Sequence, residues 1–172
     1  MRKLLAILML VCISSGASAQ AYVGGTVGIG VEHASADGGS LTNSAFLIAP
    51  EGGYYFNPTW AVGASVGVKY QDLGGTGVTT VSVLPYLRGT FAHAGIIDFF
   101  GELAMGYEHQ SAGGSGVGGF VAALRPGMLI NLNDHFALTL RTTLLRYAHY
   151  DGVNGIGFAL NTNLELGLQY TF

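Results

Sequence analysis

The chain has almost no cysteine and little charge. Cys12 is the only cysteine and lies in an apolar N-terminal segment, so the rest of the chain can form no internal disulfide. Charged residues make up 10% of the sequence, whereas soluble domains carry about 25%. Lys69 is the only lysine after residue 19. This is too little charge to cover a soluble surface, and the net charge of −3 disfavours nucleic acid as a partner.

Long apolar runs are also missing beyond the N-terminus. Glycine and polar residues interrupt every such run, so the sequence predicts no membrane-spanning helix of about 20 residues. Residues 164–172 (LELGLQYTF) instead alternate strictly between apolar and polar positions, and the alternation extends back to Ile156. That is long enough for a transmembrane strand, which needs about 9–11 residues. Strands can cross lipid only in a closed barrel, because every backbone group must be hydrogen-bonded within the protein.

The N-terminus predicts export. Arg2 and Lys3 precede an apolar run over residues 4–13, and small residues follow up to Ala19. This order is typical of a cleavable secretory signal, and the run is too short for a spanning helix. We therefore expect a signal peptide over residues 1–19 and a single barrel domain over residues 20–172.

Turn signals divide the domain into eight expected strands, at residues 21–33, 42–57, 59–72, 78–92, 96–108, 118–131, 135–150 and 155–172. Three connections are tight, at residues 57–59, 93–95 and 131–134. Four are longer and mostly glycine-rich, at residues 34–41, 73–77, 109–117 and 151–154. Short periplasmic and longer external connections are typical of outer-membrane barrels. The fold expected is all-β: an eight-stranded antiparallel up-and-down transmembrane β-barrel with both termini at the periplasmic rim.

The period of two along each expected strand places the charged side chains inside. An Arg or Lys that faces lipid near the midplane costs about 2–4 kcal/mol, and the outward faces contain none. The predicted lumen charges are Glu32, Glu51, Lys69, Arg88, Glu102, Arg125, Arg141 and Glu165. Side chains just fill the interior of an eight-stranded barrel, and charges enclosed there must be paired or solvated. We expect an ion-pair network that blocks a water channel; the alternative is that the same charges line a narrow porin-like channel.

Aromatic residues gather near the ends of the expected strands. Aromatic girdles at both membrane interfaces are a feature of such barrels. The expected girdle residues are Phe56, Trp60, Tyr70, Phe91, Tyr107, Phe136 and Tyr147.

Residues 49–64 (APEGGYYFNPTWAVGA) and the C-terminal Tyr170, Thr171 and Phe172 resemble the small eight-stranded outer-membrane barrels of the OmpA and OmpX type. The resemblance implies the location and architecture of an integral outer-membrane protein of a Gram-negative bacterium. Members of this group include membrane stabilisers and adhesins, and we expect a structural or envelope-maintenance role. Tyr170 and Phe172 would form the terminal signal that the barrel assembly machinery reads. The expected partners are that machinery, periplasmic chaperones, outer-membrane lipids and lipopolysaccharide; we expect a monomer without a cofactor.

Two further functions are considered and disfavoured. Residues 146–155 (RYAHYDGVNG) resemble the active-site region of lipid A deacylases, whose nucleophilic serine lies two residues after a histidine. Here Asp151 takes that position after His149, so the nucleophile is missing and we expect no enzyme. The other histidines are too dispersed in sequence to indicate a metal site. A surface adhesin is disfavoured because residues 34–41 and 109–117 offer few Trp, Tyr or Arg anchors.

Overall fold

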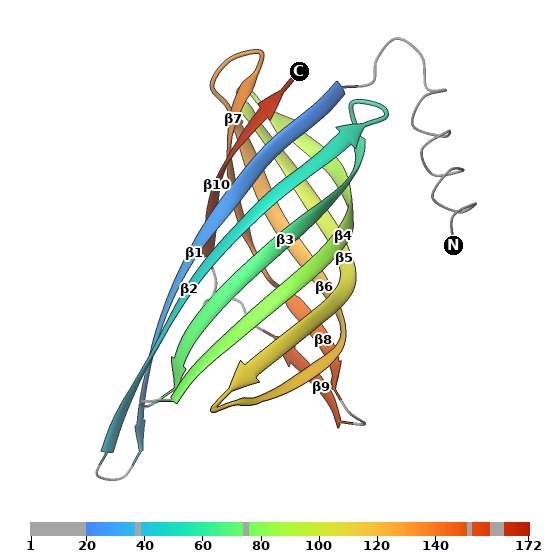
Figure 1. Ribbon diagram of the computed structural model, residues 1–172. Coiled ribbons are helices and arrows are strands. Elements are labelled where there is room, and N and C mark those ends of the chain that lie inside the picture. The colour runs from blue at the N-terminus through green and yellow to red at the C-terminus, as the bar shows by residue number, and fades with distance from the viewer. Residues whose placement is uncertain (1–19, 37–38, 74–75, 151–152, 159–163) are drawn as a thin grey trace, which may run out of the picture.

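A computed structural model describes residues 20–36, 39–73, 76–150, 153–158 and 164–172, which form an antiparallel β-barrel (Figure 1). The strand segments are β1 (Gln20–Ala36), β2 (Gly39–Tyr55), β3 (Trp60–Leu73), β4 (Thr76–Ala94), β5 (Ile97–Ala112), β6 (Ser115–Asn131), β7 (Phe136–Thr142), β8 (Leu145–Tyr150), β9 (Val153–Phe158) and β10 (Leu164–Thr171). The expected signal peptide, residues 1–19, lies outside the described residues. None of the described residues forms a helix long and apolar enough to cross a membrane.

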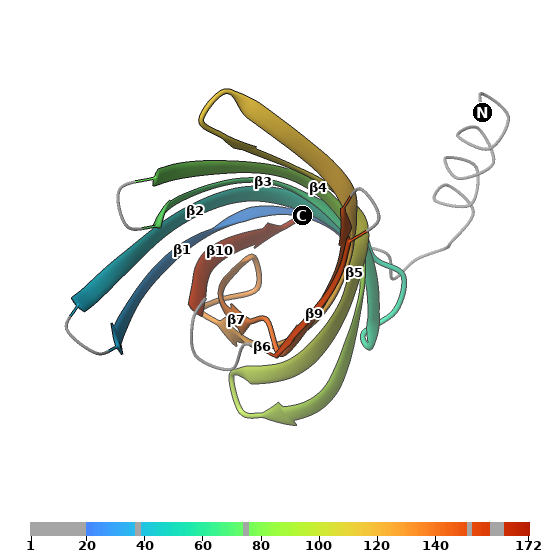
Figure 2. The same ribbon diagram turned by 90° about the horizontal axis from the view of Figure 1, so that it is seen from below.

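The segments make eight barrel strands. Strands β1 to β6 are continuous, the seventh consists of β7 and β8, which both pair with β6, and the eighth consists of β9 and β10. Pairing of β1 with β10 and of β5 with β6 completes the ring, which Figure 2 shows from one end. Residues 159–163, which we expected to belong to one continuous last strand, lie outside the description. The predicted eight-stranded antiparallel barrel is confirmed.

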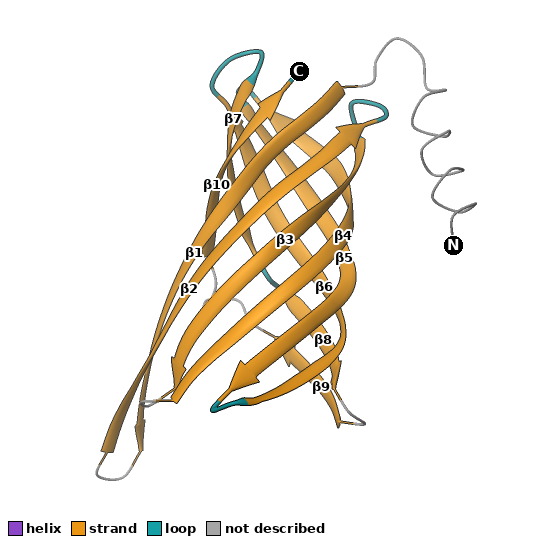
Figure 3. Cartoon of the chain, in the orientation of Figure 1, coloured by secondary structure: helices purple, strands orange, loops and turns teal. Residues whose placement is uncertain are grey.

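The start of β1 and the end of β10 lie at one rim of the barrel, called here the terminal rim; the opposite one is called the outer rim (Figure 3). At the terminal rim the backbone N–H of Phe172 donates to the carbonyl of Ala21, 2.9 Å away. The turns between β2 and β3, β4 and β5, and β6 and β7 lie at this same rim, as expected for a barrel with an even number of strands.

The barrel is apolar outside and charged inside. In β10, Leu164, Leu166 and Leu168 are exposed while Glu165 and Gln169 are buried, so the alternation seen in the sequence maps directly onto the two faces. Among the largest fully buried side chains are Arg88, Arg141 and Glu102 rather than leucines or isoleucines. This inverts the usual distribution in soluble proteins.

All four expected long connections are too long, because the strands continue into them. Strands β3 and β4 pair as far as Leu73 and Thr76, and β8 and β9 as far as Tyr150 and Val153. Strands β5 and β6 pair as far as Ala112 and Ser115, which leaves a two-residue turn at Gly113 and Gly114 in place of a loop over residues 109–117. Both glycines have positive φ, at 56° and 86°, as a tight hairpin turn with the right twist requires. Likewise β1 and β2 pair up to Ala36 and Gly39, within the loop expected at residues 34–41.

The expected strand at residues 135–150 is interrupted by a bulge. Arg141 pairs with Gly127, whereas Leu145 pairs with Leu124, so four steps along the seventh strand match three along β6. An extra residue in one strand reverses which face the following side chains occupy. Arg141 and Arg146 therefore both face the lumen, although they lie five positions apart and a regular strand would place them on opposite faces.

Tyrosines fill the lumen near the terminal rim. Tyr22 and Tyr86 lie 2.7 Å apart at their hydroxyls and pack with Ala61 and Ala104. Gly63 provides the space, since a Cβ atom there would lie 2.5 Å from Cζ of Tyr86.

Candidate functional site

Six charged side chains from six strands meet in the middle of the lumen. They form the central cluster: Glu51, Arg88, Glu102, Arg125, Arg141 and Glu165. All six residues are buried. Three carboxylates face three guanidinium groups, so the cluster is formally neutral.

Glu102 contacts all three arginines. Arg88 donates from Nε to Oε1 at 2.8 Å, and its Nη2 lies 2.7 Å from the same oxygen. Oε2 of Glu102 lies 2.9 Å from Nη2 of Arg125 and 3.5 Å from Nη1 of Arg141. This carboxylate thus joins β5 to its two neighbours β4 and β6 and to β7, the next strand around the ring.

Arg88 joins Glu102 to the side of the lumen nearer the terminal rim. Its Nη1 donates to Oε1 of Gln169 at 2.8 Å, and its Nη2 donates to Oε1 of Glu51 at 3.3 Å. The guanidinium carbon also lies 4.5 Å from the ring centroid of Phe100, within cation–π range. With every side of its guanidinium in contact, Arg88 is completely buried.

Arg141 closes the other side of the cluster. Its Nε donates to Oε2 of Glu165 at 2.6 Å, and Nη1 donates to Oε2 of Glu51 at the same distance. Nη2 donates to the Thr26 hydroxyl at 3.0 Å. Glu51 therefore bridges Arg88 and Arg141, which makes the cluster one connected network.

Arg125 is the least satisfied member. Its Nε and Nη2 atoms are buried without a hydrogen bond to any described residue, although Nη2 lies close to Glu102. The geometry of that contact is an ion pair rather than a hydrogen bond. The guanidinium carbon lies 5.5 Å from the Tyr86 ring centroid, which adds a cation–π contact.

Two predicted lumen charges are not among these six. Lys69 is partly exposed on β3. It lies four residues beyond Ser65, which pairs with Glu51, and so is nearer the outer rim than the central cluster. The side chain of Glu32 lies outside the described residues.

A second polar group lies nearer the outer rim and was not predicted. This outer cluster consists of Glu108, Gln110, Arg146 and Tyr150. Arg146 pairs with Glu108 and donates to the Tyr150 hydroxyl at 2.8 Å, while the Tyr150 hydroxyl donates to Glu108 at 2.9 Å. Gln110 donates to the same hydroxyl at 3.0 Å. The period of two from Glu102 could have placed Glu108 inside, but the bulge in the seventh strand hid its partner.

The expected girdle residues lie on the outer surface. Phe56, Trp60, Tyr70, Phe91, Tyr107 and Phe136 are exposed, and Tyr147 is partly exposed. At the C-terminus, the Tyr170 ring packs edge-on against Phe136 and Phe172, with centroids 4.9 and 5.0 Å away. Tyr170 is partly buried in this group, whereas Phe172 stays exposed.

His149 is exposed and pairs in register with Phe120, whose side chain faces outward. Asp151 lies outside the described residues. Among the side chains that the structure describes, no group of three or more His, Cys, Asp or Glu could hold a metal ion.

Comparison with known proteins yields structural matches alone: no family model and no curated protein sequence matches the chain. Neisserial surface protein A is similar with a TM-score of 0.59 and 17% identity, over 88% of this chain and 97% of that one. Outer Membrane Protein W of E. coli has a TM-score of 0.55 and 12% identity, over 92% of this chain and 100% of that one. The outer membrane protein OprG from Pseudomonas aeruginosa has a TM-score of 0.52 and 12% identity, over 91% of this chain and 96% of that one. The chain thus has the fold of the small outer-membrane β-barrels.

Proposed function

We propose that the protein is an integral outer-membrane barrel with a structural, envelope-maintenance role, whose lumen the central cluster closes. The observation that carries this proposal is the contact of the buried Glu102 carboxylate with three arginines from three other strands. Charges enclosed in a low-dielectric interior persist only when they are paired and hydrogen-bonded. Further contacts of Arg141 with Glu51 and of Arg88 with Gln169 join strands that are not neighbours in the ring. Each of the six central charges is therefore paired within the cluster, which supports a lumen closed to ions.

The location follows from the fold and the outer surface. The exposed apolar faces suit the hydrocarbon region, and the aromatic residues near the strand ends suit its interfaces. Outer-membrane lipids and lipopolysaccharide are the proposed surroundings. The ring closes within one chain and leaves no unpaired barrel edge near the terminal rim, which supports a monomer.

The exposed Phe172 and its neighbour Tyr170 are the proposed signal for the barrel assembly machinery, with periplasmic chaperones as earlier partners. The terminal rim then faces the periplasm. No catalytic activity is proposed. The sequence supports this, because Asp151 occupies the position where the resemblance to lipid A deacylases would require a nucleophilic serine.

Planar-bilayer recording of the folded chain from Gln20 onward tests the closed lumen. We expect no steady conductance, and channel openings after Arg88→Ala removes the side chain that joins Glu102, Glu51 and Gln169. Arg146→Ala is the matched control, because it removes an arginine from the outer cluster and leaves the central one intact.

Steady channels in the unsubstituted protein would contradict the proposal. They would favour the narrow porin-like channel, with the central charges as its filter. Silence in the unsubstituted protein and in both variants would show that Arg88 does not hold the lumen closed.

A further inference from the structure

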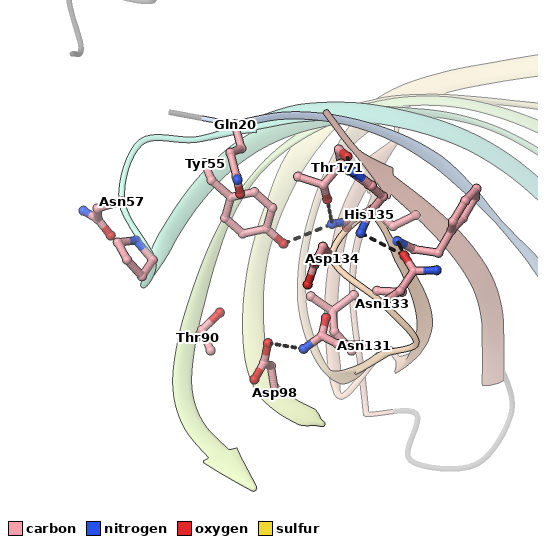
Figure 4. A pocket seen from close by; sticks show the side chains of 15 residues that line it. Gln20, Tyr55, Asn57, Thr90, Asp98, Asn131, Asn133, Asp134, His135 and Thr171 are labelled. Carbon is pink, nitrogen blue, oxygen red and sulfur yellow. Dashed lines mark hydrogen bonds between the residues drawn. The ribbon is translucent and has the colours of Figure 1, made fainter. Parts of the chain in front are cut away.

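The mouth of the barrel at the terminal rim contains a cavity of about 240 Å³. Its wall comes from the turns between β2 and β3 and between β6 and β7, from the ends of β4, β5 and β10, and from the first residue of β1. Figure 4 shows polar side chains around this hollow, among them Asp98, Asn131, Asp134 and His135. The cavity has no part in the closure of the lumen, which the central cluster provides.

The cavity carries negative charge. Asp98 and Asp134 both line it, and none of the described lining residues is an Arg or a Lys. Asp98 accepts a hydrogen bond from Asn131 at 2.8 Å and lies 2.6 Å from the His93 ring, so its carboxylate is held in place. Asp134 makes no hydrogen bond or ion pair through its side chain with another described residue, which leaves its carboxylate available to a ligand. The neutral central cluster does not offset this charge.

The floor of the cavity is polar and anchored. Gln169 lies at its base and donates to the Tyr55 hydroxyl at 3.3 Å, and the carbonyl of the same amide accepts from Arg88. A molecule that enters from the terminal rim therefore meets a polar surface held in place by these hydrogen bonds and stops above Arg88.

The rest of the lining suits a carbon chain. Pro58 and the largely buried Leu129 and Ala137 add apolar surface beside the carboxylates. The structure provides no metal-binding group among its described side chains. A mixed lining of this kind matches a small organic ammonium compound, whose charged end pairs with a carboxylate and whose methylene groups contact the apolar wall.

We propose that this cavity is a binding site for small organic amines, with Asp98 and Asp134 as the residues that recognise the ammonium group. The site is open to the compartment that the terminal rim faces. Binding needs only the cavity and its carboxylates, so it is independent of whether the lumen conducts.

Calorimetric titration of the folded protein in lipid nanodiscs tests the proposal, with putrescine as the probe and succinate as an anion of the same chain length. We expect saturable binding of putrescine and none of succinate. Asp134→Asn should weaken putrescine binding by at least about tenfold, the usual loss when a charge-assisted hydrogen bond is removed. Asp72→Asn, on β3 next to the outer rim, is the matched control and should leave binding unchanged.

Asp98→Asn is the second variant, and the Asp98→Asn, Asp134→Asn double variant should abolish binding. Retention of the slow-migrating folded form on unheated SDS gels checks that each variant is folded. Absence of saturable putrescine binding, equal binding of succinate, or wild-type affinity in the double variant would each overturn the proposal. None of these results depends on conductance, so the amine site and the closed lumen can fail separately.

Discussion

At the scale of single residues, Glu102 has more charged neighbours than either other acid of the central cluster. It contacts three arginines, Glu51 contacts two, and Glu165 contacts Arg141 alone. A buried charge that loses its partner costs more than the pair itself contributes. The energetic weight of each acid should therefore follow the number of guanidinium groups that it neutralises.

Glu102→Gln should be strongly destabilising, by about 3–5 kcal/mol, because three arginines lose negative charge at once. Glu165→Gln should cost clearly less, since Arg141 keeps its 2.6 Å contact with Glu51. Urea unfolding in lipid vesicles, followed by fluorescence of the single Trp60, measures both free energies. Equal losses for the two variants would show that the number of arginine contacts does not set stability.

The period of two predicted which charged residues face the lumen, but it did not predict which acid pairs with which base. Alternation placed Glu51, Arg88, Glu102, Arg125, Arg141 and Glu165 on inner faces, and the structure brings all six together. Which acid meets which base depends on the stagger of strands around the ring. Residues 14 positions apart, such as Arg88 and Glu102, and residues 90 apart, such as Glu51 and Arg141, meet at similar distances.

At the scale of the strand, register decides whether a charge faces lipid or lumen. Glu165 of β10 pairs in register with Gly28 of β1 and with Arg141 of β7. A slip of one residue would turn its carboxylate toward lipid and remove the partner of Arg141. The last strand should therefore tolerate substitutions on its outer face far better than a change in its length.

Insertion of one alanine between Leu166 and Gly167 tests this register. We expect loss of most of the folded, membrane-inserted protein, because part of β10 must present its polar face to lipid. The measurement is the fraction of the slow-migrating folded form on unheated gels. An alanine inserted between Gly113 and Gly114, in the turn between β5 and β6, is the control and should fold normally; normal folding of the β10 insertion would contradict the assigned register.

The bulge between β7 and β8 shows where the period of two fails. Up to Arg141 the sequence pattern and the structure agree, but beyond it the extra residue turns Arg146 inward to meet Glu108. A bulge changes the face of every later side chain in the strand and leaves almost no local signal. The shortened connections at the outer rim have a different cause: hydrogen bonding between neighbouring strands overrides the turn preference of Gly, Ala and Ser.

At the scale of the whole molecule, the barrel is stabilised by closure. Strand β1 pairs with β2 on one side and with β10 on the other, so the first and last strands complete the ring. Exposed apolar surface covers the outside, and the formally neutral central cluster fills the middle. Ring closure pairs the backbone groups of the strands and the central cluster pairs the buried charges, so polar groups are satisfied within one chain, as a bilayer demands.

Closure within one chain predicts a monomer whose stability does not depend on concentration. The urea midpoint should stay constant when the protein-to-lipid ratio is lowered tenfold, because no partner chain contributes to the fold. Refolding into vesicles at several ratios measures this, and light scattering in detergent gives the mass of the unit. A midpoint that falls on dilution would mean that an oligomer stabilises the barrel.

The sequence by itself determined the class of fold, because the period of two and the lack of charge are local properties that need no knowledge of neighbours. It also determined which face of each regular strand meets lipid. Only the tertiary structure decided the pairing around Glu102, the inward turn of Arg146 and the cavity between Asp98 and Asp134. These depend on stagger, bulges and ring closure, which are set by contacts between residues far apart in the chain.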